Sequence, residues 1–380
     1  MGEEVNSKTR VRLSLQHREP DRIPIDLGTM TVSGIHINAY SELIKSLGRK
    51  ESLRIYDKYQ QLAYVSENIR EEFSVDTIPV IFNDLELYEE NNKEEIIFDE
   101  WGIKRKKPKN GYYYDGISYP LKELDLNELK KVDFLKILEK INFNDIKRKN
   151  KNLKESNRAI IGQLWPGSLF QWAGFLRGFD TFLIDLMINK IFAETLLNKL
   201  LEYNIAYANK YLDIFGDTID VIKIADDIGM QDAPIISLSL YREAIKNKHK
   251  QLINFIKSKS GAKVLFHCDG AIYDYIPEFI EIGVDIIQPV QVSAKGMGDT
   301  KKLKKEFGKD LVFWGGSCDP QGILVKNDCD KVIEETKRRI EDLAPGGGFI
   351  FSPIHNIQPN TPPKNIIVMF NSAIEYGKYF

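Results

Sequence analysis

Four short apolar segments in the C-terminal half of the chain end in the same way. Each stops on polar residues or glycines and is followed by a stretch with helical periodicity: 263–269 (KVLFHCD), 284–290 (VDIIQPV), 311–316 (LVFWGG) and 347–356 (GGFIFSPIHN). Buried strands with polar groups only at their C-terminal ends are typical of a parallel α/β barrel, whose site lies at that end. The pattern therefore predicts both the fold class and the location of the site.

Four further apolar segments bring the number of expected strands to eight, the number in a TIM (β/α)8 barrel. They span residues 23–29, 77–82, 159–164 and 220–226. Amphipathic stretches, in which apolar residues recur every three or four positions, are expected to form the covering helices. These stretches span residues 59–73, 193–215, 239–258, 329–344 and 362–377. Alternating strands and helices predict a parallel sheet with right-handed crossovers.

The interval between the second and third expected strands is too long for one crossover helix. We therefore expect a single domain over residues 1–380 with an insertion at about 84–157. A turn signal at 107–111 (KPKNG) predicts a β-hairpin, whose basic run is interpreted as a solvated tip, and residues 122–141 are expected to be helical. The glycines at 346–348 precede a strand, which favours a tight turn at the barrel bottom over a phosphate-binding loop.

Composition limits the classes of partner and the cellular compartment. With 53 basic and 55 acidic residues the formal net charge is −2, so no overall field favours nucleic acid or an anionic membrane. Three cysteines, Cys268, Cys318 and Cys329, do not suggest a disulfide framework and fit a reducing cytoplasm. The charged N-terminal segment resembles no signal peptide, and no apolar run approaches the roughly 20 residues of a membrane helix. We expect a soluble, cytoplasmic protein that acts on a small molecule.

The strongest candidate for chemistry is the pair His267 and Asp269. The two residues are separated by one position on a strand, so their side chains share one face while that of Cys268 points away. This spacing suits two ligands of one metal ion, or a general acid with the carboxylate that orients it. His355 ends the eighth strand and would complete a set of two histidines and one carboxylate. The alternative is that His355 only hydrogen-bonds its own loop.

Other polar residues at strand ends are candidates, and each has a structural alternative. Asp226 and Asp227 end the fourth strand, where at most one of them points directly into the site; Asp226 is expected to contact substrate, and Asp227 could instead cap the next segment. Substrate contact is also expected for amides and a carboxylate at the other strand ends, against N-capping or loop stabilisation as the alternative. These residues are Gln231, Gln288, Asp319, Gln321 and Asn356.

Three tryptophans, Trp165, Trp172 and Trp314, lie at or just after expected strand ends. They could form an aromatic wall around an apolar or ring-shaped ligand, and core packing is the alternative. Cys318 lies beside the same constellation and is a secondary metal candidate, which would need a neighbour that activates its thiol.

The sequence resembles the uroporphyrinogen decarboxylase superfamily over nearly its whole length. The resemblance is carried by RLSLQHREPDRIPID, VDTIPVIFND, IADDIGMQDAPIISLSLYREAI, HCDG, VQVSAKGM, GGSCDPQ and GGFIFSPIHNIQPNTPPKNI. It implies a TIM barrel and one of two activities. One branch contains decarboxylases of porphyrin precursors that use no cofactor, and the other contains methyltransferases that depend on a corrinoid (cobalamin).

The decarboxylase branch implies Asp84 and His355 as catalytic residues. Trp172 stands where that branch has a tyrosine, and the loop at 26–40 lacks the arginines that neutralise a substrate with many carboxylates. Decarboxylation of uroporphyrinogen or a related tetrapyrrole is therefore the alternative function. A barrel that binds a ligand without catalysis is a third hypothesis.

The methyltransferase branch implies zinc held by a His-x-Cys pair and by a cysteine before a loop similar to IQPNTP. Here these positions hold His267, Asp269 and His355, and Asp227 is a further catalytic candidate. Replacing thiolates by a carboxylate and an imidazole makes a metal more Lewis-acidic, which favours polarising the oxygen of a methyl ether. The leading hypothesis is metal-assisted methyl transfer between a methylated small molecule and a corrinoid carried by a partner protein.

Overall fold

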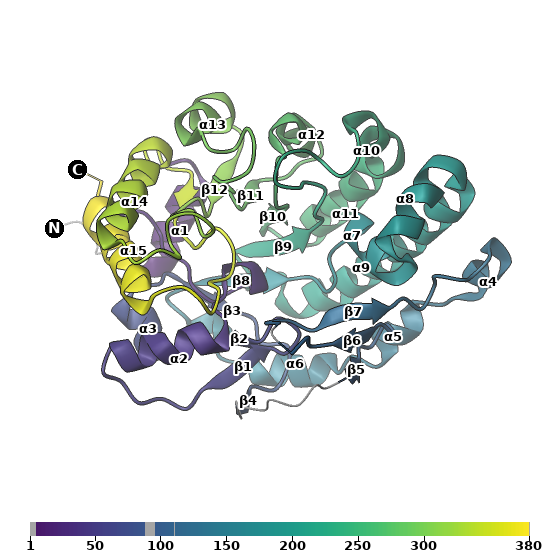
Figure 1. The fold of residues 1–380 in the computed structure, drawn as a ribbon, viewed down its shortest axis with the longest axis horizontal. Coiled ribbons are helices and arrows are strands. Elements are labelled where there is room, and N and C mark those ends of the chain that lie inside the picture. The colour runs from purple at the N-terminus through teal and green to yellow at the C-terminus, as the bar shows by residue number, and fades with distance from the viewer. Residues whose placement is uncertain (1–4, 88–95, 110, 380) are drawn as a thin grey trace.

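The chain folds around one curled parallel sheet (Figure 1). The computed structural model describes residues 5–87, 96–109 and 111–379. The strand order β13-β12-β11-β10-β9-β8-β3 keeps sequence neighbours adjacent, and every pairing is parallel. The strands are β3 (Thr77–Pro79), β8 (Ala159–Gln163), β9 (Val221–Ala225), β10 (Lys263–His267), β11 (Ile286–Gln288), β12 (Val312–Trp314) and β13 (Phe349–Ile350). The predicted TIM-barrel-like α/β fold is confirmed.

The first predicted strand, residues 23–29, is not a regular strand, but it bridges the two edges of the sheet. On one side, the Asp26 amide donates to the Phe351 carbonyl oxygen at 2.8 Å, and the Phe351 amide donates to the Pro24 carbonyl oxygen at 2.8 Å. On the other side, the Asp76 amide donates to the Ile25 carbonyl oxygen at 2.7 Å. The segment therefore takes the eighth place, between β13 and β3.

A buried carboxylate fixes this closure. Asp76 precedes β3 and is fully buried. It accepts hydrogen bonds from the Ile25 amide at 2.9 Å, from Arg10 Nη1 at 2.6 Å and from Arg22 Nη1 at 2.7 Å. Arg10 lies on α1 (Ser7–Leu15), so one side chain ties α1, the closing segment and the sheet together.

Helices surround the sheet, with α14 and α15 on one side and α8 and α9 on the other (Figure 1). Their bounds are α2 (Ile37–Ser46), α3 (Glu67–Glu72), α7 (Phe170–Arg177), α8 (Phe179–Ile188), α9 (Lys190–Phe215), α10 (Leu238–Ala244), α11 (Lys246–Lys259), α12 (Ile276–Glu281), α13 (Thr300–Phe307), α14 (Cys329–Leu343) and α15 (Pro363–Tyr376). Among the residues that the structure describes, no helix combines the length and apolar character needed to cross a membrane.

Two predicted helices differ from the structure. The stretch 59–73 is helical only in α3, because Ser66 caps that helix by accepting from the Ile69 amide, and the preceding apolar residues form β2 (Leu62–Ala63). The stretch 239–258 is divided into α10 and α11, since the backbone leaves helical geometry at Ile245.

Among the described residues, two small antiparallel sheets lie outside the barrel. One sheet pairs β2 with β1 (Arg54–Asp57), both of which precede β3, and with β4 (Glu86–Leu87) at the start of the insertion, and it was not predicted. The other contains β5 (Ile96–Phe98), β6 (Lys104–Lys106) and β7 (Asp115–Ser118), so the predicted hairpin gains a third strand. The predicted helical part forms α4 (Leu126–Lys131) and α5 (Leu135–Glu139), followed by α6 (Phe143–Lys149). Arg105, in the run interpreted as a solvated tip, is instead buried, and its Nε donates to Asp99 Oδ2 at 2.9 Å. Residue 110, in the predicted turn, lies outside the described residues.

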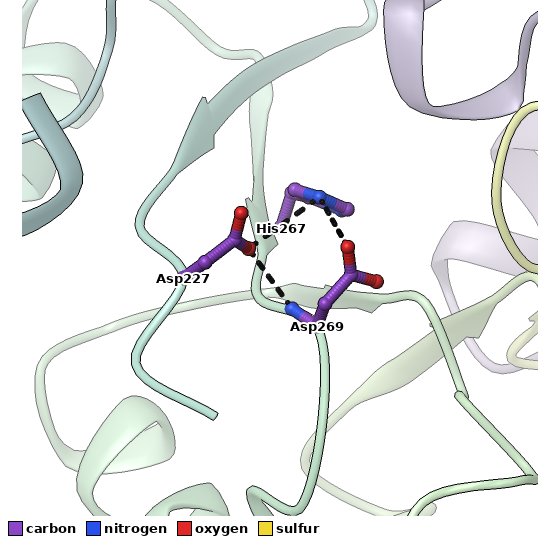
Figure 2. A group of neighbouring side chains, drawn as sticks. All are labelled: Asp227, His267 and Asp269. Atoms are coloured by element: carbon purple, nitrogen blue, oxygen red, sulfur yellow. Dashed lines mark hydrogen bonds and ion pairs between the residues drawn. The ribbon is translucent and has the colours of Figure 1, made fainter. Parts of the chain in front are cut away.

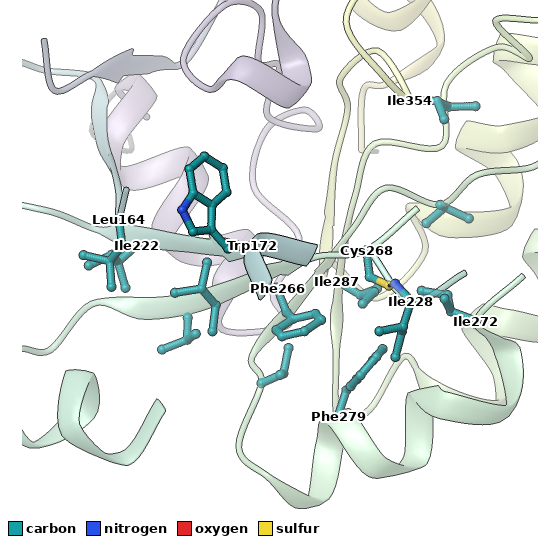
Figure 3. Packing of buried hydrophobic residues seen from close by; sticks show 14 of the residues in the cluster. Leu164, Trp172, Ile222, Ile228, Phe266, Cys268, Ile272, Phe279, Ile287 and Ile354 are labelled. Carbon is teal, nitrogen blue, oxygen red and sulfur yellow. The ribbon is translucent and has the colours of Figure 1, made fainter. Parts of the chain in front are cut away.

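The side chains of the sheet alternate between two apolar clusters. Outward residues such as Ile222, Phe266 and Ile287 pack in the cluster under the helices (Figure 3). Inward residues such as Val221 and Leu265 form a second cluster with Val11 and Leu15 of α1, which covers the N-terminal end of the barrel. At the next inward position toward the C-terminal ends, β8, β9, β10 and β11 carry polar residues instead: Gln163, Lys223, His267 and Gln288. The site begins at this layer.

The glycines at 346–348 pack at the opposite end, as predicted. All three have positive φ, between 68° and 78°. A side chain on Gly347 would lie 2.5 Å from the Arg18 carbonyl oxygen, and the Gly348 amide donates to the Ser14 carbonyl oxygen at 3.1 Å. They form a tight turn against the C-terminal end of α1.

We predict that Asp76→Ala lowers the free energy of unfolding by about 3–5 kcal/mol, because it leaves two arginines without their buried partner. Urea unfolding followed by circular dichroism measures this. The control Glu243→Ala breaks an exposed ion pair, in which the side chains of Glu243 and Lys190 are 59% and 60% exposed. It should lower the free energy of unfolding by less than about 1 kcal/mol. Equal losses in the two variants would contradict the role of Asp76.

Candidate metal centre

Three side chains converge at the C-terminal ends of β9 and β10: Asp227, His267 and Asp269 (Figure 2). His267 Nε2 lies 3.6 Å from Asp227 Oδ1 and 3.5 Å from Asp269 Oδ2. The Asp269 amide donates to Asp227 Oδ1 at 3.0 Å, which holds the two carboxylates around the ring. Ligand atoms of the three residues all lie within 4.8 Å of one another, so the group could hold a metal ion.

Electrostatics at this group favour a cation between the carboxylates. Burial alone would lower the pKa of His267, but the charges of Asp269 and Asp227 outweigh it and the pKa is raised. Burial would raise the pKa of Asp269, yet the charge and hydrogen bond of His267 lower it to about 2. Burial dominates at Asp227, whose pKa is raised. The two carboxylates therefore favour positive charge at this point, and His267 in turn favours the ionised form of Asp269.

Gln288 fixes the orientation of the His267 ring. This residue ends β11 directly beside His267 in the parallel register, and it is fully buried. Its Oε1 lies 2.5 Å from His267 Nδ1, and its Nε2 donates to the Ile354 carbonyl oxygen at 3.3 Å. Because the amide oxygen can only accept, Nδ1 carries a proton, and Nε2 is the atom that faces the carboxylates. Gln288, predicted to contact substrate, thus positions His267.

The three residues fit a zinc ion. In a tetrahedral site with bonds of about 2.1 Å, ligand atoms lie about 3.4 Å apart, close to the separations from His267 Nε2. A ring nitrogen held by a hydrogen bond at its other nitrogen is also the usual arrangement of a histidine ligand. The predicted set contained His355, whose Nε2 lies 3.8 Å from Asp269 Oδ2 and whose side chain is 35% exposed. His355 therefore approaches the group at its rim, while Asp227 joins it directly.

A cavity of about 500 Å³ lies between the C-terminal end of β8 and segments outside the barrel; Gln163 of the inward polar layer lines it, whereas Asp227, His267 and Asp269 do not. Its wall includes Tyr56, Tyr59, Gln163 and Trp165. The rings of Tyr59 and Trp165 are parallel within 5°, with centroids 6.4 Å apart. Glu100 holds both, since it accepts from the Tyr59 hydroxyl at 3.2 Å and from Trp165 Nε1 at 2.5 Å. The cavity is suited to a planar or ring-bearing molecule.

Asp84 lies on the same cavity wall, although it is not part of the metal centre. Its side chain is 82% exposed, and its carboxylate pairs with Lys149 at 2.9 Å. Among the described residues, no hydrogen bond or ion pair joins Asp84 to His267 or to either carboxylate of the centre.

Asp226 is a structural residue, in contrast to its predicted contact with substrate. It is fully buried, and its oxygens accept from the Ser168 hydroxyl and from the amides of Leu169, Phe170 and Gln171 at the start of α7. His249 Nε2 lies 2.8 Å from the same carboxylate. Asp226 therefore anchors α7, and Asp227 is the member of the pair that faces the site.

Two tryptophans and Asn356 also lie in structural positions. Trp172 is 4% exposed and packs edge-on behind Trp165, with centroids 5.2 Å apart. Trp314 is fully buried in the barrel, where its Nε1 donates to Asp26 at 3.0 Å. Asn356 is fully buried and accepts from the Tyr113 hydroxyl at 2.9 Å. Of the three tryptophans predicted to form an aromatic wall, only Trp165 lines the cavity.

The remaining candidates stabilise loops. Asp319 accepts from the Gln321 amide at 2.9 Å, and Gln321 is exposed. Gln231 donates to the Ser293 carbonyl oxygen at 2.5 Å. Cys318 donates to Glu335 at 3.3 Å, and burial together with that carboxylate raises the pKa of its thiol, so it is not an activated thiolate.

Lys223 and the part of the cavity wall that comes from segments outside the barrel were not identified from the sequence. A lysine in the middle of the apolar segment 220–226 was a visible signal, because charged residues rarely occupy buried strands without a role. Tyr59 and Glu100 gave no such signal, since they reach Trp165 only through the tertiary fold.

Comparisons with known proteins agree with this architecture. The profile of the family described as uroporphyrinogen decarboxylase (URO-D) matches residues 117–376. A uroporphyrinogen decarboxylase from Rickettsia felis is 26% identical over 179 residues, which is 47% of this chain and 47% of that protein. The chain thus matches about half the length of this curated relative.

A solved structure of a methyltransferase from Methanosarcina mazei superposes with a TM-score of 0.62 at 19% identity. The superposition covers 98% of this chain and 99% of that chain, and at this identity it shows the fold alone. The family profile, in contrast, covers more than half of the sequence. The chain therefore belongs to the uroporphyrinogen decarboxylase family, whose members are enzymes.

Proposed function

We propose that this protein transfers a methyl group between a methylated small molecule and a corrinoid carried by a partner protein. The observation that carries the proposal is the group of Asp227, His267 and Asp269 at the C-terminal end of the barrel. Two carboxylates and an oriented imidazole around one point form a donor set for a Lewis-acidic metal.

Asp227, His267 and Asp269 would hold a zinc ion. When bound, zinc supplies Lewis acidity, which lowers the cost of releasing an oxygen from a methyl group. In the proposed reaction the carbon–oxygen bond of a methyl ether breaks, and its electron pair stays with the oxygen. The methyl carbon forms its new bond with the electron pair of the reduced corrinoid. The electrons are balanced without a further reductant.

The chain's own residues would bind and orient the methylated molecule. Gln288 keeps Nε2 of His267 directed at the carboxylates. The parallel rings of Tyr59 and Trp165 offer faces for a ring-bearing donor within the 500 Å³ cavity. The resemblance of the sequence to the corrinoid-dependent branch of the superfamily supports the corrinoid as the partner's group.

The alternative is decarboxylation of uroporphyrinogen or a related tetrapyrrole, supported by the likeness to the Rickettsia protein. Two observations favour methyl transfer over it. The loop at 26–40 contains no arginine to neutralise a polycarboxylate. Asp84, implied as the catalytic carboxylate of that reaction, is largely exposed and paired with Lys149.

We predict one zinc ion per chain after equilibrium dialysis, and its loss in His267→Ala and Asp269→Ala. Plasma mass spectrometry measures the metal. Asp319→Asn, which alters a carboxylate in a loop, should keep the full metal content. The methyl transfer itself is followed by the absorbance of methylcobalamin, formed from cob(I)alamin and 4-methoxybenzoate.

Two outcomes would contradict the proposal. One is a protein without stoichiometric zinc in which His267→Ala changes nothing. The other is decarboxylation of uroporphyrinogen by the metal-free protein, which would establish the alternative.

We further predict that Gln288→Leu weakens zinc affinity by about tenfold to a hundredfold, because the His267 ring loses the partner that fixes its proton and its orientation. Competition with a chromogenic chelator measures the affinity. Gln321→Leu removes an exposed amide in the loop after β12 and should bind zinc as the wild type does. An unchanged zinc affinity in Gln288→Leu would show that Gln288 does not position His267.

A further inference from the structure

Lys223 occupies an unusual place inside the barrel. It lies in the middle of β9, level with Gln163 on β8 and Leu265 on β10. Val221, two residues earlier, packs in the inward cluster, so the Lys223 side chain also points inward. The residue is only 7% exposed.

In the parallel register, Lys223 lies between Gln163 of β8, which lines the cavity, and the strand β10, which ends in His267 of the metal centre. The carboxylates that act on it most strongly are those of Asp227, Asp57 and Asp269, of which Asp57 lines the cavity and the other two belong to the centre. The charge of Lys223 in turn acts to lower the pKa of Asp57 and the pKa of His267. Burial lowers the pKa of Lys223 to about 8, which leaves it mostly cationic at neutral pH.

No direct partner is present for this charge. In the described parts of the chain, no carboxylate oxygen lies within 4.0 Å of Lys223 Nζ, and no hydrogen bond from it is formed. The neighbouring carboxylates have partners of their own: Asp57 accepts from the Gln60 amide at 2.7 Å, and Asp227 accepts from the Asp269 amide at 3.0 Å. The residue is largely but not completely buried, so its charge has lost most of its hydration, and an anionic group from outside the chain would offset that cost.

The other cations near the cavity do not serve the same purpose. Lys149 is engaged by Asp84 at 2.9 Å and by Asp145 at 2.6 Å. Lys58 and Lys140 lie on the cavity wall but are exposed to solvent. Among the described residues at the cavity and the centre, Lys223 is thus the buried lysine that is not engaged in an ion pair, and one such cation matches one anionic group.

We propose that Lys223 binds the anionic head group of a singly charged substrate, a carboxylate or sulfonate, whose ring lies in the cavity beside Tyr59 and Trp165. This molecule would be the substrate of the site for which methyl transfer is proposed. Only the reaction it undergoes depends on that proposal; its binding by Lys223 does not. A polycarboxylate would leave most of its charges without a partner in this cavity.

The test compares 4-methoxybenzoate with methoxybenzene, its neutral counterpart, by calorimetry on protein freed of metal by a chelator. We expect the wild type to bind the anion about tenfold to a hundredfold more tightly, the range of a hydrogen bond to a charged group. Lys223→Met should abolish this preference while keeping the affinity for methoxybenzene. Lys223→Arg should retain most of it, and Lys250→Met, an equal loss of charge on the outer helix α11, should leave it unchanged.

Equal wild-type affinities for the two probes would overturn the inference, as would a preference that survives in Lys223→Met. Weaker binding of both probes in Lys223→Met would indicate a structural role and would also overturn it. Circular dichroism shows whether each variant is folded, and if Lys223→Met is not, the wild-type comparison and Lys223→Arg decide. The measurement needs neither zinc nor corrinoid, so a protein with anion preference but no zinc would refute methyl transfer and leave this inference intact.

Discussion

The parallel register of β9, β10 and β11 is the constraint on which the candidate site depends. It places Ala225, His267 and Gln288 side by side as inward residues at the ends of adjacent strands. The Gln288 amide therefore reaches the His267 ring, and the two carboxylates that follow β9 and β10 meet at its other nitrogen. A slip of one residue in any of these strands would turn the side chain away and dismantle the group.

Much of the barrel could be predicted because its strands have a simple signature. Seven of the eight expected segments contain a strand, since buried parallel strands are short apolar runs. The segment 23–29 makes only an isolated bridge, because its pairing is shared with the side chain of Asp76. The stretch 59–73 is helical only in α3, because Leu62 and Ala63 belong to a strand pair that precedes β3, which periodicity cannot distinguish from a helix.

The location of the site could be predicted better than the residues that form it. His267 and Asp269 follow from their spacing, but Asp226 and Asp227 are equivalent in sequence, and only the tertiary fold sends one to α7 and the other to the site. The tryptophans differ for the same reason, since packing against Trp101 and Phe175 buries Trp172, while Trp165 lines the cavity. Lys223 could have been identified from the sequence, because it is a charged residue within an apolar strand.

The wall of the cavity has a consequence for how proteins of this fold diversify. One of its two parallel rings, Trp165, follows a barrel strand, whereas Tyr59 and Glu100 come from segments outside the barrel. The candidate metal ligands all lie on the barrel itself. Exchange of the outer segments could therefore change which molecule is recognised while the reactive groups remain in place, so that selectivity and reactivity evolve on separate parts of one gene.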